Sequence, residues 1–396
     1  MKPTFDKIDV LLWIGAIIAT IALTSCGGGS VAGVGSGGTG IVTSKATSVG
    51  SITGFGSVIV NGVRYDDSGA SIGDEDGARN RSDLKLGMVV RVQADVSSNG
   101  GATATSITFG SELLGPVSAV GSGGTSFTII GQQVLTTAST VFDSSLAQGA
   151  ASVQAGQLIE VHGFLNPNNN TLQATLVERK SAALLYKISG LVQQLQTGPK
   201  TFQIGNEVIS FANAAASDLP GGLANGQLVK LRLTPQVPST GAPWQITRAR
   251  NDAPGNADVD KFELEGLITE FTSSSQFRVG TQLVDARSAS FPNGTGTVVL
   301  GARVEVKGAL QGGVLVAAQV KIENSSDNQI ELSGPLANVN SAAKTFSVSG
   351  VTVSYSAAQF DNGNAAQLVN GVQVEIKGQP IVNSSVINAE RIKFKN

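Results

Sequence analysis

The stretch Gly156–His162, GQLIEVH, is one of five similar stretches that decide how this chain is interpreted. Each begins with glycine and two variable residues, followed by apolar, polar or charged, apolar, and polar or charged residues. The other copies are Gly87–Gln93, Gly226–Arg232, Gly301–Lys307 and Gly371–Lys377. Each follows, by 35 to 41 residues, another glycine that opens an apolar segment, at Gly50, Gly115, Gly190, Gly266 and Gly334. The chain is therefore an array of one repeated module.

The repeated stretch has the alternation of a β-strand with one buried and one wet face. In the second copy Ile159 and Val161 are apolar, whereas Glu160 and His162 are polar. Successive side chains of a strand point to opposite faces, so this pattern puts one face in a core. A strand with a wet face is typical of antiparallel sheets and barrels. Closed barrels also remove the free edges that promote aggregation.

Each module contains further strand signals in a fixed order. After the opening strand comes a hairpin such as Val58–Tyr65, whose central Asn61-Gly62 favours a two-residue type I′ turn. A polar loop follows, with room for a short helical turn, then the glycine-led strand and a last strand, and no segment reads as an amphipathic helix. We therefore expect an all-β chain of about five small antiparallel, OB-like barrels. Their predicted bounds are 46–112, 113–187, 188–262, 263–330 and 331–396.

The segment Gly54–Asp66, GFGSVIVNGVRYD, the later hairpins and the G-x-x-V-E-V-x-G strands resemble tandem copies of a bacterial family, the domain of unknown function 5666. The resemblance covers almost all of residues 50–396. It implies a small β-barrel module carried by exported proteins. It brings no catalytic residues that could be transferred to this chain.

The composition favours a folded chain and disfavours nucleic acid as a partner. Charged residues make up 14% of the 396 residues and apolar residues 41%; disordered chains combine low hydrophobicity with high net charge. The net charge of -2 provides no excess of cations for a phosphate backbone, and 5% aromatic residues leave few platforms for stacking bases.

Residues 1–25 have the pattern of a bacterial export signal. Lys2 and Lys7 precede an apolar run, Leu11–Leu23, which is shorter than the roughly 20 residues that a membrane helix needs. The run leads into Leu-Thr-Ser-Cys, which resembles the lipobox of bacterial lipoproteins. The resemblance implies cleavage between Ser25 and Cys26 and acylation of Cys26. Residues 26–45 would then be the acylated cysteine and a glycine-rich tether. An ordinary signal or a membrane helix is the alternative.

Cys26 is the only cysteine, so no disulfide can form within the chain. His162 is the only histidine, and long polar side chains occupy its place in the other copies. We therefore expect a solvated surface histidine rather than a catalytic base or a zinc ligand. Ser341–Lys344 matches S-x-x-K, but lacks the companion motifs of that chemistry. Its position between the first strand and the hairpin of the fifth module predicts a turn.

Carboxylates cluster at two places. Asp74–Asp76, with Asp83 nearby, could bind Ca²⁺, but the spacing does not fit an EF-hand loop, and a solvated loop partly neutralised by Arg79 and Arg81 is expected. Glu263 and Glu265 lie at alternate strand positions, as a pair of glycosidase acids or an ordinary exposed strand edge would.

Aromatic residues offer one candidate contact. Phe55, Phe127, Phe202, Phe277 and Phe346 recur before the hairpins and are expected in the cores. Trp244 has no counterpart in the other modules. Because Pro238 and Pro243 flank it, we expect an exposed insertion in which Trp244 touches a ligand.

These features predict a non-catalytic, lipid-anchored cell-envelope protein, placed in the outer membrane, whose modules form a multivalent binding or structural arm. Its expected partners are membrane lipid, through acylated Cys26, and an envelope glycan or protein; no cofactor and no metal is expected. An envelope glycan or peptidoglycan hydrolase that uses Glu263 and Glu265 is the alternative. A single-strand nucleic-acid binder is a third hypothesis, which the composition opposes.

Overall fold

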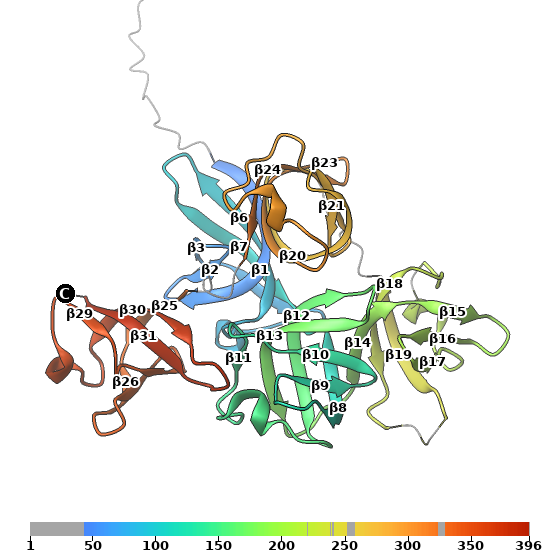
Figure 1. Ribbon diagram of the computed structural model, residues 1–396, viewed down its shortest axis with the longest axis horizontal. Coiled ribbons are helices and arrows are strands. Elements are labelled where there is room, and N and C mark those ends of the chain that lie inside the picture. The colour runs from blue at the N-terminus through green and yellow to red at the C-terminus, as the bar shows by residue number, and fades with distance from the viewer. Residues whose placement is uncertain are drawn as a thin grey trace, which may run out of the picture. The chain divides into compact units, whose positions relative to one another are not determined.

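The computed structural model describes residues 43–219, 221–237, 239, 241–251, 258–323 and 329–395. Its regular elements are β-strands and short 3₁₀ turns, and no α-helix occurs among these residues (Figure 1). Within the same ranges, no helix has the length and apolar character to cross a membrane. The predicted signal, the cleavage site, Cys26 and the glycine-rich segment lie outside the described residues, apart from the last residues of the predicted 26–45 tether, which belong to the first strand.

The first module is a closed ring of five strands. They are β1 (Thr43–Phe55), β2 (Val58–Val60), β3 (Val63–Asp66), β6 (Val89–Ser97) and β7 (Ala102–Phe109). The ring runs β1, β2, β3, β7, β6 and back to β1, and every pairing is antiparallel except that of β3 with β7. β4 (Ser71–Asp74), β5 (Gly77–Ala78) and the 3₁₀ turn η1 (Arg81–Asp83) lie between β3 and β6. A five-stranded Greek-key ring of this kind is the OB-type barrel.

The other four modules repeat this strand order. The second contains β8 (Leu113–Val120), β9 (Ser126–Ile129), β10 (Gln132–Leu135), β11 (Val141–Phe142), η2 (Gly149–Ser152), β12 (Leu158–Asn166) and β13 (Thr171–Lys180). The third contains β14 (Tyr186–Leu191), β15 (Gln193–Gln196), β16 (Thr201–Ile204), β17 (Glu207–Ser210), η3 (Ala216–Asp218), β18 (Leu228–Leu233) and β19 (Trp244–Asn251).

The fourth contains β20 (Val259–Ser273), β21 (Gln276–Val279), β22 (Gln282–Asp285), η4 (Thr295–Thr297), β23 (Arg303–Gln311) and β24 (Val314–Ile322). The fifth contains β25 (Ile330–Pro335), β26 (Ala337–Asn340), β27 (Thr345–Val348), β28 (Val351–Ser354), β29 (Gln359–Asp361), η5 (Ala365–Gln367), β30 (Gln373–Pro380) and β31 (Ile387–Phe394). Figure 1 shows β20, β21, β23 and β24 of the fourth module curving into a ring, and the buried apolar side chains of this module form one cluster. The prediction of about five OB-like barrels is confirmed.

The glycine of the repeated stretch ties each ring together. All five glycines have a left-handed backbone, with φ between 79° and 92°, which only glycine adopts without strain. In each module its N–H donates over 2.8 Å to a carbonyl of the first strand or, in the third and fifth modules, of the single residue that interrupts it, as Gly301 does to Ile268. The N–H of that acceptor residue in turn donates to the carbonyl of the residue after the glycine. The five glycines are Gly87, Gly156, Gly226, Gly301 and Gly371. The stretch therefore fixes where the fourth strand joins the first.

A β-bulge follows the stretch in every module. The register between the fourth and last strands shifts directly after its final residue. These final residues are Gln93, His162, Arg232, Lys307 and Lys377. Because a bulge puts an extra residue in one strand and re-aims nearby side chains, the same position is singled out in all five barrels.

Alternate apolar side chains fill the rings. Phe127, Phe202, Phe277 and Phe346 are at most 2% exposed, as predicted. The hairpin pairing gives the corresponding place in the first module to Val58, which pairs with Tyr65 as Phe127 pairs with Val134. Phe55 is also buried, but it lies in β1 and is not the counterpart of the other four.

Strands also pair between modules. β1 runs parallel to β20 over Ala46–Val49 and to β25 at Gly54 and Phe55, and β8 pairs with β14. The first strands of the third and fourth modules begin at Tyr186 and Val259. These starts precede the predicted 188 and 263, because the strands extend upstream of the apolar pattern.

Candidate functional sites

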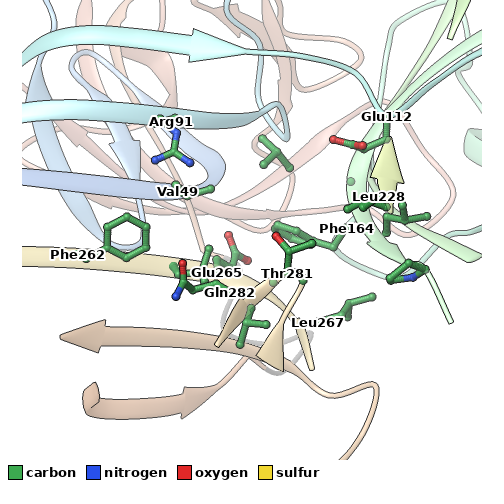
Figure 2. Close-up of a pocket in the computed structure, with 18 residues that line it drawn as sticks. Val49, Arg91, Glu112, Phe164, Leu228, Phe262, Glu265, Leu267, Thr281 and Gln282 are labelled. Carbon is green, nitrogen blue, oxygen red and sulfur yellow. The ribbon is translucent and has the colours of Figure 1, made fainter. Parts of the chain in front are cut away.

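A cavity of about 400 Å³ lies beside β1, β12 and β20. Figure 2 shows its mixed lining, in which the apolar side chains of Val49, Phe164 and Phe262 lie near the polar groups of Arg91 and Gln282. Its volume is in the range of small-molecule sites, which combine an apolar lining with a few polar groups. No motif in the sequence indicated this cavity, since its lining comes from distant segments.

Glu265, one of the two candidate hydrolase acids, lies in the wall of this cavity and is buried. The Arg303 guanidinium donates to Glu265 Oε1, with Nε at 2.8 Å, while Ser51 donates to Oε2 from its backbone N–H at 2.8 Å and its hydroxyl at 3.1 Å. The prediction of an exposed edge is wrong here, because β20 pairs with β1 and the Glu265 carboxylate is held by Ser51 of that strand. Both carboxylate oxygens are occupied by donors of the protein itself.

Glu263 is partly exposed, and its carboxylate lies 3.6 Å from Lys307 Nζ. Burial raises the pKa of the Glu263 carboxyl, although the Lys307 ammonium opposes that rise. The two acids therefore sit in unlike surroundings, one fixed by an arginine and one beside a lysine. Glu265 lines the cavity, whereas Glu263 is not among its lining residues.

His162 is 2% exposed, so the prediction of a solvated surface histidine is wrong. Its Nδ1 lies 3.1 Å from the Gly110 carbonyl oxygen, which can only accept a hydrogen bond. His162 lines a second cavity, of about 410 Å³, together with Lys85, Met88 and Phe109 of the first module. The pattern of one strand cannot predict which residues of another module will cover it. Burial lowers the pKa of the His162 imidazole. The ring is therefore neutral near pH 7, with the proton on Nδ1.

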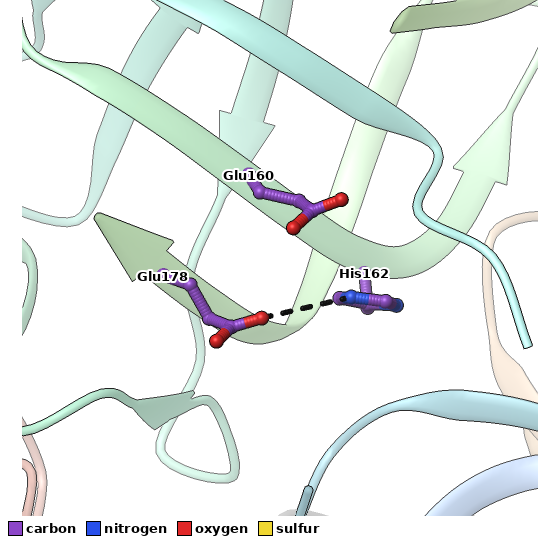
Figure 3. A group of neighbouring side chains, drawn as sticks. All are labelled: Glu160, His162 and Glu178. Carbon is purple, nitrogen blue, oxygen red and sulfur yellow. Dashed lines mark ion pairs between the residues drawn. The ribbon is translucent and has the colours of Figure 1, made fainter. Parts of the chain in front are cut away.

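Two carboxylates accompany His162 (Figure 3). Glu160 precedes His162 by two residues in β12, and Glu178 lies opposite Glu160 on the neighbouring strand β13. Glu178 Oε2 is 3.9 Å from His162 Nε2, which exceeds a hydrogen bond. One ligand-type atom from each of the three residues lies within 4.8 Å of the others.

Three lysines surround these carboxylates. Lys85 contacts Glu178 Oε1, and Lys180 Nζ lies 2.7 Å from Glu160 Oε2 and 3.4 Å from Glu178 Oε2. Lys187 Nζ lies 3.5 Å from Glu160 Oε1. Burial alone would raise the pKa of Glu160. The imidazole of His162, once acid protonates it, and the ammonium groups of Lys180 and Lys187 outweigh burial and lower this pKa to about 2.

The acidic cluster at Asp74–Asp76 is only partly the self-neutralised loop that was predicted. Arg79 pairs with Asp74 at 2.7 Å, as expected. Arg81 pairs instead with Asp67. Glu75 and Asp76 accept from the buried Arg232 of the third module, at 2.7 and 3.1 Å. No local pattern could predict this partner, because it lies more than 150 residues away.

Trp244 is 7% exposed, so the prediction of an exposed insertion is wrong. Its indole Nε1–H donates to Glu207 Oε2 over 2.8 Å, and its ring meets Tyr186 edge-on with centroids 6.2 Å apart. Trp244 begins β19, which closes the third ring against β17, so the ring draws it inward. It still lines a surface cavity of about 410 Å³ with Pro116 and Val237, and its contact with a ligand stays a prediction.

Ser341–Lys344 forms the turn between β26 and β27, which confirms that prediction.

Tandem closed five-stranded barrels define the class of this protein. The model of the family described as "Domain of unknown function (DUF5666)" matches residues 39–108, 115–178, 265–321 and 333–393. These regions make up more than half of the chain, and the chain therefore belongs to this family. The matches fall on the first, second, fourth and fifth modules; the third repeats their strand order without being part of the matched regions.

No curated protein matches the chain significantly. Among solved structures, the chain is similar to one described as "drosophila Unr CSD456", with a TM-score of 0.14 and 12% identity over 54% of this chain and 98% of that one. The barrel topology rests on the strand pairings, and this likeness adds no inference about function.

Proposed function

We propose that this chain is a non-catalytic, lipid-anchored protein of the bacterial cell envelope, whose barrels serve together as a binding or structural arm for an envelope glycan or protein. The repetition of one closed barrel carries the proposal. Five similar modules on one chain raise the effective concentration of weak contacts at a repetitive surface. The anchor follows from the lipobox-like Leu23–Cys26.

The carboxylates give less support to the hydrolase alternative. Glu265 is held by Arg303 and Ser51, and Glu263 lies beside Lys307. A retaining or inverting glycosidase needs two carboxyl groups facing one glycosidic bond, with a proton to give and a face for water or a nucleophile. In this chain the carboxylates of Glu263 and Glu265 are instead paired with cations and donors of the protein itself.

The full chain and its Cys26→Ser variant test the anchor. We expect the wild type to incorporate a labelled fatty acid and to fractionate with membranes, and the variant to do neither. Binding is measured by co-sedimentation with purified peptidoglycan sacculi and by pull-down from envelope extract. If sacculi release soluble fragments with the wild type but not with Glu263→Gln, the protein is a hydrolase and the proposal of a non-catalytic arm is wrong.

A further inference from the structure

His162 Nε2 and Glu178 Oε2 are two buried atoms that face each other 3.9 Å apart, and the Lys180 ammonium lies 3.4 Å from Glu178 Oε2. Because the Gly110 carbonyl oxygen can only accept, Nδ1 of His162 carries a proton, and in the neutral ring Nε2 then carries the lone pair. Neither Nε2 nor Glu178 Oε2 has a hydrogen-bond partner among the described residues. Buried acceptors without a donor cost free energy, because they lose the hydrogen bonds that water would give them. Such a pair is explained if a cation binds between them.

We propose that Glu160, His162 and Glu178 form a binding site for a divalent transition-metal ion of the zinc type. The imidazole nitrogen selects such ions over Mg²⁺ and Ca²⁺, which take oxygen ligands. Three protein ligands leave a further position for water.

The geometry fits this ion with small adjustments. Two ligand atoms about 2.1 Å from a tetrahedral zinc lie about 3.4 Å apart, and the observed separation of Nε2 and Oε2 is 3.9 Å. With Glu160, the three residues offer one ligand atom each, and these atoms all lie within 4.8 Å of one another. The hydrogen bond from Nδ1 to Gly110 orients the ring as second-shell acceptors do for metal-bound histidines.

Lys180 is the competitor that the metal must displace. Its ammonium contacts Glu160 Oε2 and lies close to Glu178 Oε2, so it stands at the ion's place. Its side chain is 31% exposed, and that of Lys85 is 48% exposed. Both can turn toward water while the carboxylates stay fixed on β12 and β13. Metal binding is therefore an exchange of a lysine for a divalent ion, and removal of Lys180 strengthens it.

The other barrels provide an internal comparison. The position of His162 is taken by Gln93, Arg232, Lys307 and Lys377, none of which offers an imidazole. The site belongs to the second barrel alone, and Lys377→Gln is a matched control at the same position of another barrel.

The full chain is titrated with Zn²⁺ by calorimetry and with Co²⁺ by visible absorption, without a histidine tag and with Cys26→Ser to remove the only thiol. Because the chain has one histidine, the ¹⁵N signals of its imidazole report the site directly. We expect one bound equivalent, a shift of Nε2 with Nδ1 still protonated, and the d–d bands of Co²⁺.

His162→Gln and Glu178→Gln should each abolish binding, Lys180→Ala should tighten it by about tenfold because one competing charge is removed, and Lys377→Gln should leave it unchanged. Far-UV circular dichroism shows which variants fold. If His162→Gln does not fold, the binding measured with Glu178→Gln and Lys180→Ala tests the proposal. Imidazole signals that ignore Zn²⁺, or binding that Lys180→Ala weakens, would overturn the proposal.

Discussion

The pair formed by Glu265 and Arg303 should be the most sensitive electrostatic contact of the fourth barrel. Both side chains are 7% exposed, and Glu265→Gln preserves volume while removing the only negative charge that faces the guanidinium in this contact. A buried charge that loses its partner costs about 3–5 kcal/mol. We therefore expect Glu265→Gln to lower the free energy of unfolding of this barrel by about 3 kcal/mol or more.

The assay is hydrogen–deuterium exchange of β20 and β23, because local opening of one barrel is visible there even when the whole chain does not unfold in one step. Glu270→Gln is the control: Glu270 pairs with Arg278 at 3.1 Å with both side chains exposed, and such pairs contribute about 0–1 kcal/mol. Replacing both buried partners, Glu265→Leu with Arg303→Met, should restore most of the protection. Equal exchange in Glu265→Gln and Glu270→Gln would refute this reasoning.

Three further predictions concern single positions. Gly301→Ala, at φ 81°, should cost about 1–2 kcal/mol in urea unfolding, whereas Gly296→Ala, whose added Cβ meets nothing within 4 Å, should stay within about 0.5 kcal/mol. Burial raises the pKa of Tyr65 from 10.0 to about 12; the folded state then holds that proton more tightly, so stability should fall as the pH rises through this window, and Tyr65→Phe should remove the fall in a pH series of melting curves. Trp244→Phe should cost about 1–3 kcal/mol because Glu207 loses its donor, and an unchanged melting temperature would contradict that hydrogen bond.

The barrels could be predicted because their signals are local. Alternation in Gly156–His162 and the Asn61-Gly62 turn depend on neighbours along the chain, and the left-handed φ values of Asn61 and Gly62 are those that the turn requires. Ring closure repeats the same short pattern five times. The core phenylalanines follow from the same periodicity, with Phe55 misplaced because Val58 fills its role.

The sites could not be predicted in the same way because they are made by contacts between distant segments. The strand pattern places His162 on the solvent-facing side of its strand, but residues of the first module cover the side chain and bury it. Arg232 pairs with Glu75 across more than 150 residues. Trp244 looked exposed beside its prolines, although the closing strand of its ring turns it inward. A polar residue on a strand has no local signal that tells which neighbour will cover it.

The bulge after each repeated stretch makes the preceding residue replaceable. Glutamine, histidine, arginine and lysine all occur there, while the register shift that follows them is the same in all five modules. Selection can therefore change the chemistry of one barrel without rebuilding it or its siblings. The chain therefore offers a protein engineer five structurally equivalent positions, each of which accepts a different side chain.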